Sequence, residues 1–204
     1  MGESIVQVTE GSGKKLHTWQ RTVGANSVED EFTIPGEYPL ASYIAAGVNT
    51  STGTANDHLL QVMAGASLNV RVRRIRLAQA GLVTSAANVS VSLYRLTSAG
   101  TGGTAITPSR LDTADAASGA TAMTLPTVKG TESTLIFTRR AFFTQTSAVG
   151  GLAPNAGWEW VQLPGSKPLI IPAGAANGIA LKLIAAYAGA TVDIEIEFTE
   201  TSFL

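Results

Sequence analysis

The chain has 204 residues, no cysteine and a formal net charge of −1. Because cysteine is absent, the chain contains neither disulfides nor thiolate metal sites, and a charge so close to zero gives no reason to expect nucleic acid or a membrane as a partner. Hydrophobic residues make up 45% of the chain, aromatic residues only 6% and charged residues 14%. This composition is typical of a β-rich globular protein and unlike that of a disordered or coiled-coil chain.

The first 56 residues are expected to form an extended arm and linker. Their apolar side chains come without sustained periodicity, which is the pattern of anchors on an irregular segment that lies in grooves. A long irregular segment is unusual inside a compact domain, so we expect the arm to cross to another subunit. The expected anchors are Trp19, Phe32, Ile34, Tyr38 and Tyr43.

The charges are unevenly distributed between the arm and the rest of the chain. Residues 1–66 carry three cations and seven anions, whereas residues 67–204 carry eleven cations and eight anions. An acidic segment beside a basic body suits docking on that body or on a neighbouring one. Uneven solvation of the two parts is the alternative interpretation.

The amino terminus has neither the basic region nor the apolar stretch of a signal peptide, and no run is long enough to span a membrane, so we expect a protein made and kept soluble in a cytosol.

Residues 57–204 are predicted to form one domain of about eight strands. Short runs with period-two alternation are separated by clusters of Gly, Thr, Ser, Ala and Pro, and no βαβ rhythm or fixed repeat occurs. The pattern predicts an all-β antiparallel sandwich of the jelly-roll type. A single helical turn or two is expected at 111–119. The predicted strands are 58–63, 67–78, 88–96, 134–144, 158–163, 168–171, 178–185 and 191–199.

Two of these strands carry opposite charges on their polar faces. In 67–78 the apolar positions shift by one residue at Arg73 and Arg74, which indicates a β-bulge. We expect this strand and 191–199 to be neighbours, with their apolar faces toward the core and a stripe of cations beside a stripe of anions outside. The stripe comprises Arg71, Arg73, Arg74, Arg76, Asp193, Glu195 and Glu197.

Motifs for catalysis or cofactor binding are weak. The glycines before Lys14 lack the spacing of a phosphate-binding loop, and the two histidines, His17 and His58, have no metal-ligand spacing. No Gly-x-Ser-x-Gly sequence promotes a serine nucleophile, and alternate carboxylates on a strand stand about 7 Å apart, too far to share one small ion. We therefore expect neither an enzyme nor a bound cofactor or metal.

Trp158 and Trp160 are two residues apart and so share one face of a strand. Paired aromatic rings on an exposed face can form a platform for sugars, which is the one feature that favours a carbohydrate-binding role. Packing in the core or in a subunit interface is the alternative, and we favour it because large side chains are few in this chain.

Several segments resemble a family of small virion proteins of tailed bacteriophages. They are Val-Arg-Arg-Ile-Arg-Leu (72–77), the Val-Ser-Leu-Tyr-Arg-Leu run with its Gly/Thr-rich turn (91–104), Leu-Asp-Thr-Ala-Asp-Ala-Ala (111–117), Lys-Pro-Leu-Ile-Ile-Pro-Ala-Gly (167–174) and Val-Asp-Ile-Glu-Ile-Glu-Phe (192–198). The resemblance implies a jelly-roll capsid decoration, or cement, protein, commonly trimeric, on the outer surface of the capsid. It assigns no functional residues.

This resemblance predicts a structural protein that stabilises a capsid by arm exchange and by burial at subunit interfaces. Its partners would be further copies of itself, as a homotrimer, and the major capsid protein, with no nucleic acid or membrane. The alternatives are a tail or fibre component that binds a receptor or sugar, through Trp158 and Trp160 or the Gly/Thr-rich loops, and an enzyme or host-derived module.

Overall fold

The computed structural model describes residues 18–23, 26–31, 40–80, 87–143, 157–187 and 189–202, and all regular structure within these residues is β-strand. The chain divides into two units, Met1–Pro39 and Leu40–Leu204. The first unit contains an antiparallel hairpin of β1 (Thr18–Val23) and β2 (Asn26–Glu31), which the sequence analysis did not predict. Trp19 lies on β1 opposite Asp30, whereas Phe32, Ile34 and Tyr38 lie outside the described residues.

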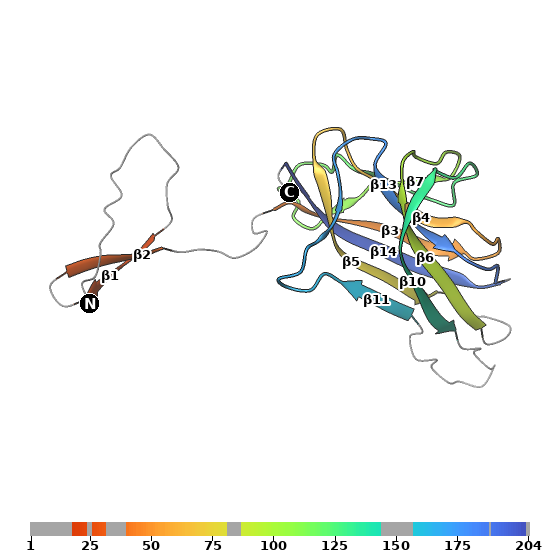
Figure 1. Cartoon of the computed structure of the whole chain (residues 1–204), viewed down its shortest axis with the longest axis horizontal. Coiled ribbons are helices and arrows are strands. Elements are labelled where there is room, and N and C mark those ends of the chain that lie inside the picture. The colour runs from red at the N-terminus through yellow and green to blue at the C-terminus, as the bar shows by residue number, and fades with distance from the viewer. Residues whose placement is uncertain are drawn as a thin grey trace. The chain divides into compact units, whose positions relative to one another are not determined.

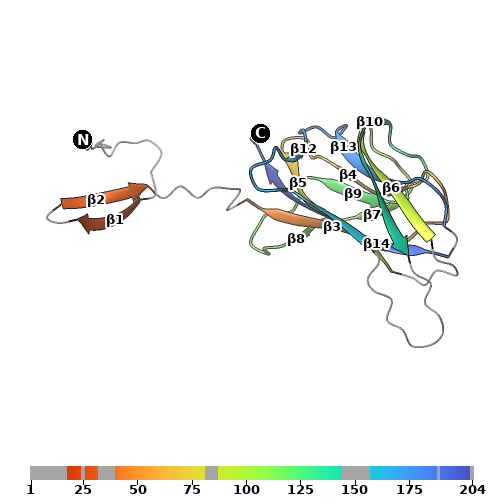
Figure 2. The same ribbon diagram turned by 60° about the horizontal axis from the view of Figure 1, so that its bottom comes forward.

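The second unit contains two antiparallel sheets of six strands each, so the expected all-β sandwich is confirmed. Figures 1 and 2 show the two layers from two directions. The first sheet has the order β10-β6-β13-β4-β9-β7, with bounds Glu132–Phe143, Ala87–Leu96, Gly178–Leu183, His58–Met63, Thr121–Thr124 and Thr104–Ile106. The second has the order β11-β5-β14-β3-β8, with bounds Gly157–Val161, Asn69–Gln79, Thr191–Thr201, Ser42–Ser51 and Ser109–Arg110, and β12 (Leu169–Ile171) also pairs with β5.

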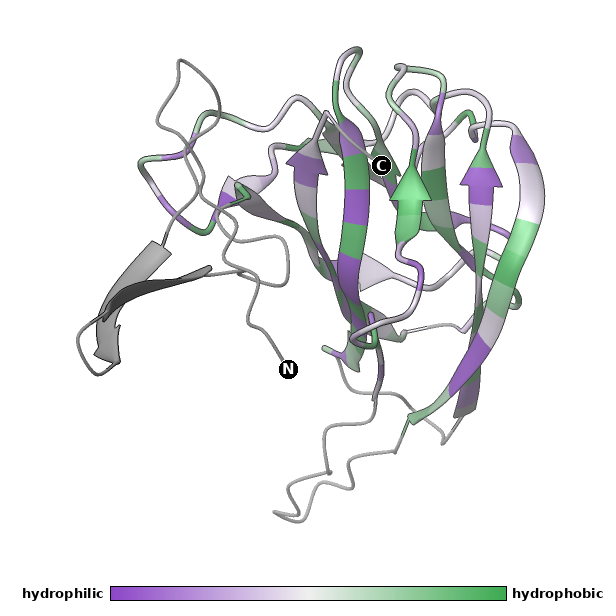
Figure 3. Ribbon diagram, turned by 60° about the vertical axis from the view of Figure 1, so that its left-hand side comes forward, coloured by the Kyte–Doolittle hydropathy of each residue, from purple (hydrophilic) through white to green (hydrophobic). Residues whose placement is uncertain are grey.

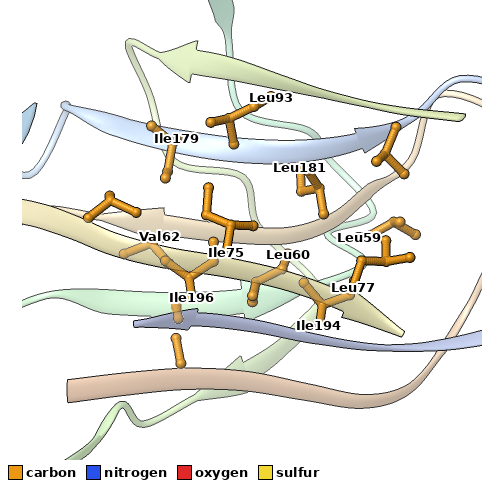
Figure 4. Packing of buried hydrophobic residues seen from close by; sticks show 14 of the residues in the cluster. Leu59, Leu60, Val62, Ile75, Leu77, Leu93, Ile179, Leu181, Ile194 and Ile196 are labelled. Carbon is orange, nitrogen blue, oxygen red and sulfur yellow. The ribbon is translucent and has the colours of Figure 1, made fainter. Parts of the chain in front are cut away.

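The core lies between the sheets and consists of aliphatic side chains from both of them. Figure 4 shows Leu60, Leu93 and Leu181 of the first sheet facing Ile75 and Ile194 of the second. The strands form because apolar residues alternate with polar ones, so that one face of each sheet is removed from water; Figure 3 shows this alternation along the strands. On β14 the inward positions Val192, Ile194, Ile196 and Phe198 are all fully buried.

β-Bulges keep the apolar residues on the inner face where the sequence changes phase. On β5, Arg74 pairs with Glu197 and Val72 with Phe198, so Arg73 is the extra residue, at the predicted position. On β4, Leu60 pairs with Leu181 and His58 with Lys182, and both Leu59 and Leu60 belong to the buried core cluster. A single inserted residue therefore restores the inward orientation of the rest of each strand.

The boundary between the arm and the sandwich lies between Pro39 and Leu40, and the expected boundary at 56/57 is wrong. The reason is β3, which pairs with β14 and lies inside the second sheet. Tyr43, expected to be an arm anchor, is a core residue of β3 that is 2% exposed and stacks on Phe198 with ring centroids 5.6 Å apart.

The expected helical turns at 111–119 do not form. This stretch consists of bends and turns, in which Asp112 Oδ1 accepts a hydrogen bond from the Ala114 N–H at 2.9 Å. Such an aspartate turn satisfies the backbone locally and competes with a helix. The short strands β7, β8 and β9 were also not predicted from the sequence.

Candidate functional site

The charged face of the second sheet is the first candidate surface. Strands β5 and β14 are neighbours, as the sequence predicted, with Arg74 opposite Glu197 and Arg76 opposite Glu195. Arg74 Nε lies 3.1 Å from Glu197 Oε2, and Arg76 Nη1 lies 3.6 Å from Glu195 Oε2. Glu159 on β11 extends this charge ladder, because its Oε1 lies 3.5 Å from Arg74 Nη1.

The three other residues of the expected stripe lie on the same two strands, beside these pairs. Asp193 pairs in register with Ala78, and its Oδ1 accepts a hydrogen bond from the Asn49 N–H at 2.9 Å. Arg71 lies opposite Thr199, and Arg73 is the bulge residue of β5. Arg74, Arg76 and the carboxylates paired with them are 27% to 47% exposed, and pairs this exposed contribute about 0–1 kcal/mol each.

The two tryptophans of β11 are turned toward the core and do not form an exposed platform. Trp158 contacts Phe137 of β10 edge to face with centroids 5.9 Å apart, and Trp160 stacks on the same ring at 6.4 Å. All three residues pack against the buried core cluster. The rings therefore pack between the edges of the two sheets, as expected if the tryptophans serve core packing and not sugar binding.

A shallow open depression lies beside Trp158, lined by Arg76, Leu77, Ala78, Gly157, Trp158 and Glu159. The Trp158 indole N–H is buried and has no hydrogen-bond partner among the residues that the structure describes. Gly157 permits a close approach, since a Cβ there would stand 2.2 Å from the Leu77 carbonyl oxygen. The hollow is thus a consequence of tight pairing between β11 and β5.

The first sheet carries a buried ionic network that no motif in the sequence predicts. His58 on β4 is fully buried, and its Nε2 lies 2.9 Å from Glu132 Oε1 at the start of β10. Lys182 of β13 places its Nζ 3.0 Å from the other carboxylate oxygen, Oε2, and 5.2 Å from the centre of the Tyr94 ring. One carboxylate therefore connects β4, β13 and β10 across the sheet.

The protonation of Glu132 follows from these contacts. Burial acts to raise the pKa of its carboxyl group, but the hydrogen bonds from His58 and Lys182 and their charges outweigh burial and hold the pKa below its ordinary value of 4.5. Glu132 is thus an anion that is fixed by two donors. A carboxylate so engaged, next to a fully buried imidazole, is suited to fastening strands together and not to accepting protons from a substrate.

A second carboxylate, Glu200, fastens a loop. Its oxygens accept hydrogen bonds from Ser118 Oγ at 2.8 Å, from the Gly119 N–H at 3.0 Å and from the Ala120 N–H at 2.8 Å. Glu200 is 7% exposed, so these bonds are shielded from water. The Tyr43 hydroxyl donates to the Ala116 carbonyl oxygen at 3.0 Å and holds the same loop; burial, followed by the charge of Glu200, raises the pKa of this tyrosine.

Within the described ranges, no group of three or more His, Asp or Glu side chains is arranged to hold a metal ion. No helix among those residues could cross a membrane. Comparison of the chain with protein-family models, with curated proteins and with solved structures gave no match.

Proposed function

We propose that this chain is a non-enzymatic structural protein of a tailed-bacteriophage particle. In this proposal it is a jelly-roll decoration protein that is made in the host cytoplasm, binds the outer surface of the capsid and stabilises it. Its partners are other copies of itself, in a homotrimer, and the major capsid protein. The N-terminal arm is exchanged between subunits.

The jelly-roll assignment is supported by the strand order. Eight of the strands fall into two sets of four, β3-β14-β5-β11 and β4-β13-β6-β10, that are contiguous in the two sheets. Along the chain, β3, β4, β5 and β6 alternate between the sheets, and so do β10, β11, β13 and β14. Paired Greek keys of this kind define a jelly roll, which is common in viral capsid proteins and also in lectins and cupins. Strands β7 to β9 are then an insertion between β6 and β10.

The observation that carries the proposal is the separate N-terminal unit. Met1–Pro39 forms a unit of its own whose described structure is a two-stranded hairpin. An isolated hairpin of two strands is marginally stable in water, because it has no second layer against which to bury its side chains. A unit of this kind is expected to become stable by docking on another surface.

The energetics of docking favour many weak contacts over one strong one. Buried apolar area contributes about 25 cal/mol per Å², from which the cost of ordering the arm is subtracted. When several copies are linked in a ring, each further contact forms at a high effective concentration, so modest individual contacts give stable occupancy. Trp19 on β1 is the described residue of the arm from which we expect the largest contribution.

The alternative role, a tail or fibre component that binds sugars, has lost its main support. It depended on Trp158 and Trp160 forming an exposed platform, whereas both rings pack on Phe137. The Gly/Thr-rich turn at 101–104 remains as a candidate contact surface, with no feature that selects a sugar.

The proposal is tested on the particle that encodes this chain. Purified particles are analysed by quantitative mass spectrometry, and particles made without the gene are compared for the temperature at which they release DNA. We expect the chain to be present at a fixed ratio to the major capsid protein, and its loss to lower the release temperature. Absence from the particle, or a copy number typical of the tail, would contradict the proposal.

A further inference from the structure

Strand β10 forms a long outer edge of the sandwich. It pairs with β6 on one side, and none of the described strands pairs with its other side. The remaining sheet ends are shorter, since β7, β8 and β11 have three, two and five residues against twelve in β10. Unpaired backbone N–H and C=O groups along such an edge are a template for a further strand.

The second half of this edge is regular. The register shifts of β10 fall between Glu132 and Phe137, and from Phe137 to Phe143 each residue pairs in sequence with β6. Residues 138–143 therefore offer a straight edge of six residues. A regular edge accepts a new strand without distortion, whereas a bulged one resists it.

Two exposed arginines mark this part of the edge. Arg139 and Arg140 are consecutive, so their side chains lie on opposite faces of the sheet. Arg139 lies over the Phe137 ring at 5.2 Å and donates to the Thr138 carbonyl oxygen, and the Arg140 side chain has no hydrogen bond or ion pair within the described part of the chain. Neither arginine has a carboxylate partner among the described residues, in contrast to Arg74 and Arg76.

The β2 strand of the N-terminal unit has the complementary pattern. It is six residues long and ends in three consecutive acidic residues, Glu29, Asp30 and Glu31. Residues 1–39 as a whole carry three cations and six anions. Consecutive arginines and consecutive carboxylates both distribute charge over two faces, so one strand laid beside the other places opposite charges together on each face.

We propose that residues 138–143 of β10 are the docking edge for the β1–β2 hairpin of a second copy, with β2 added to the first sheet as its outermost strand. This inference rests on the arm exchange of the proposed function and names its receptor. Each copy then both donates a hairpin and accepts one. The contact joins two different surfaces, and a head-to-tail contact of this type forms a ring when the rotation between neighbouring copies closes, as a trimer requires.

The test uses charge reversal in two separate chains. One variant carries Arg139→Glu with Arg140→Glu, and the other carries Glu29→Lys with Asp30→Lys. Self-association of the full-length free protein is measured by sedimentation velocity over a concentration series. Because like charges then oppose each other on both faces, each variant alone should associate roughly tenfold to hundredfold more weakly than the unmodified chain.

Mixing the two variants shows whether the hairpin docks on a second copy or on its own chain. In a mixed trimer two of the three contacts join a glutamate edge to a lysine hairpin or an arginine edge to an acidic hairpin, so the mixture should associate more strongly than either variant alone. The matched control is Arg110→Glu with Lys167→Glu, which reverses two exposed cations elsewhere on the sandwich and should leave association unchanged. If the double edge variant is unstable, Arg140→Glu alone replaces it, because this change leaves the contact of Arg139 with Phe137 in place.

Three results would overturn the inference. The first is an unmodified chain that is monomeric at all concentrations, and the second is an edge variant that associates normally. The third is a mixture that associates no better than either variant alone while a chain with all four changes associates normally, which would place the contact within one chain. Association is measured without particles. Normal self-association with no capsid binding would therefore contradict the proposed function alone.

Discussion

Replacing Glu132 with alanine should remove the carboxylate that, among the described residues, pairs with both His58 and Lys182 in the first sheet. The fully buried His58 would lose its partner at 2.9 Å, and Lys182, whose side chain is 17% exposed, would lose its partner at 3.0 Å. A buried donor left without an acceptor costs about 1–3 kcal/mol, and breaking a buried ion pair costs about 3–5 kcal/mol. Because Glu132 is itself 25% exposed, we expect a total loss of about 2–4 kcal/mol.

The loss is measured as the shift of the urea midpoint at unchanged slope, which reports the free energy of unfolding. Two further variants provide reference values for the loss in Glu132→Ala. Glu132→Gln keeps the shape and one acceptor and should lose less than the alanine variant. Glu159→Gln removes a carboxylate whose pair with Arg74 is 3.5 Å long and exposed, and should lose less than about 1 kcal/mol. If Glu132→Ala costs no more than Glu159→Gln, the network does not stabilise the sheet.

The same network predicts the sign of a pH effect. The pKa of Glu132 is lower in the folded protein than its ordinary value of 4.5, so the folded state favours the anion. This contribution is fully present above pH 4.5 and is lost as the pH falls through the lower folded-state pKa. The unmodified chain should therefore lose stability more steeply than Glu132→Gln below pH 4.5, and parallel curves would refute the assignment.

Three further substitutions test the packing and the polar contacts. Phe137→Ala removes the ring between the two tryptophans and should cost about 2–3 kcal/mol, with a red shift of the tryptophan fluorescence; unchanged emission would show that the rings are not packed as described. Glu200→Ala should cost about 2–4 kcal/mol and abolish the hydrogen-exchange protection of the Gly119 amide; retained protection would show that another group holds the loop. Arg74→Gln should cost less than about 1 kcal/mol, and less still at high salt, because its pair with Glu197 is partly exposed; a larger loss would mean that the charge ladder stabilises the sheet.

Strand patterns predicted the parts of the fold that contain runs of large apolar residues. Strand β4 was placed at 58–63, its observed bounds, and the phase change in β5 located the bulge at Arg73. Charge complementarity identified β14 as the neighbour of β5 because the cations and anions lie at matching positions. Each of these signals is contained within one or two short segments.

Strand β3 was missed because its inward residues are mostly small. Ala45 and Gly47 occupy inner positions, and a Cβ on Gly47 would stand 2.6 Å from the Thr124 methyl carbon. Asn49 has a φ of 49° at a further bulge, opposite the stretch between Val192 and Ile194. A strand that needs glycine and a left-handed residue to pass its neighbours carries little period-two signal in its sequence.

The candidate site residues show the same limit. Spacing placed Trp158 and Trp160 on one face of a strand, but the position of Phe137 in the other sheet decides that this face is the inner one. His58 and Glu132 are separated by 74 residues, and the strand order of the first sheet brings them together. Such contacts depend on topology, which local patterns do not encode.

The most direct test of the whole account is a three-dimensional reconstruction of the particle that encodes this chain. We expect the sandwich on the outer surface of the capsid in a ring of copies, with the hairpin of each copy lying against residues 138–143 of the next. Density for the sandwich in the tail, or a hairpin that lies on its own sandwich, would contradict the account.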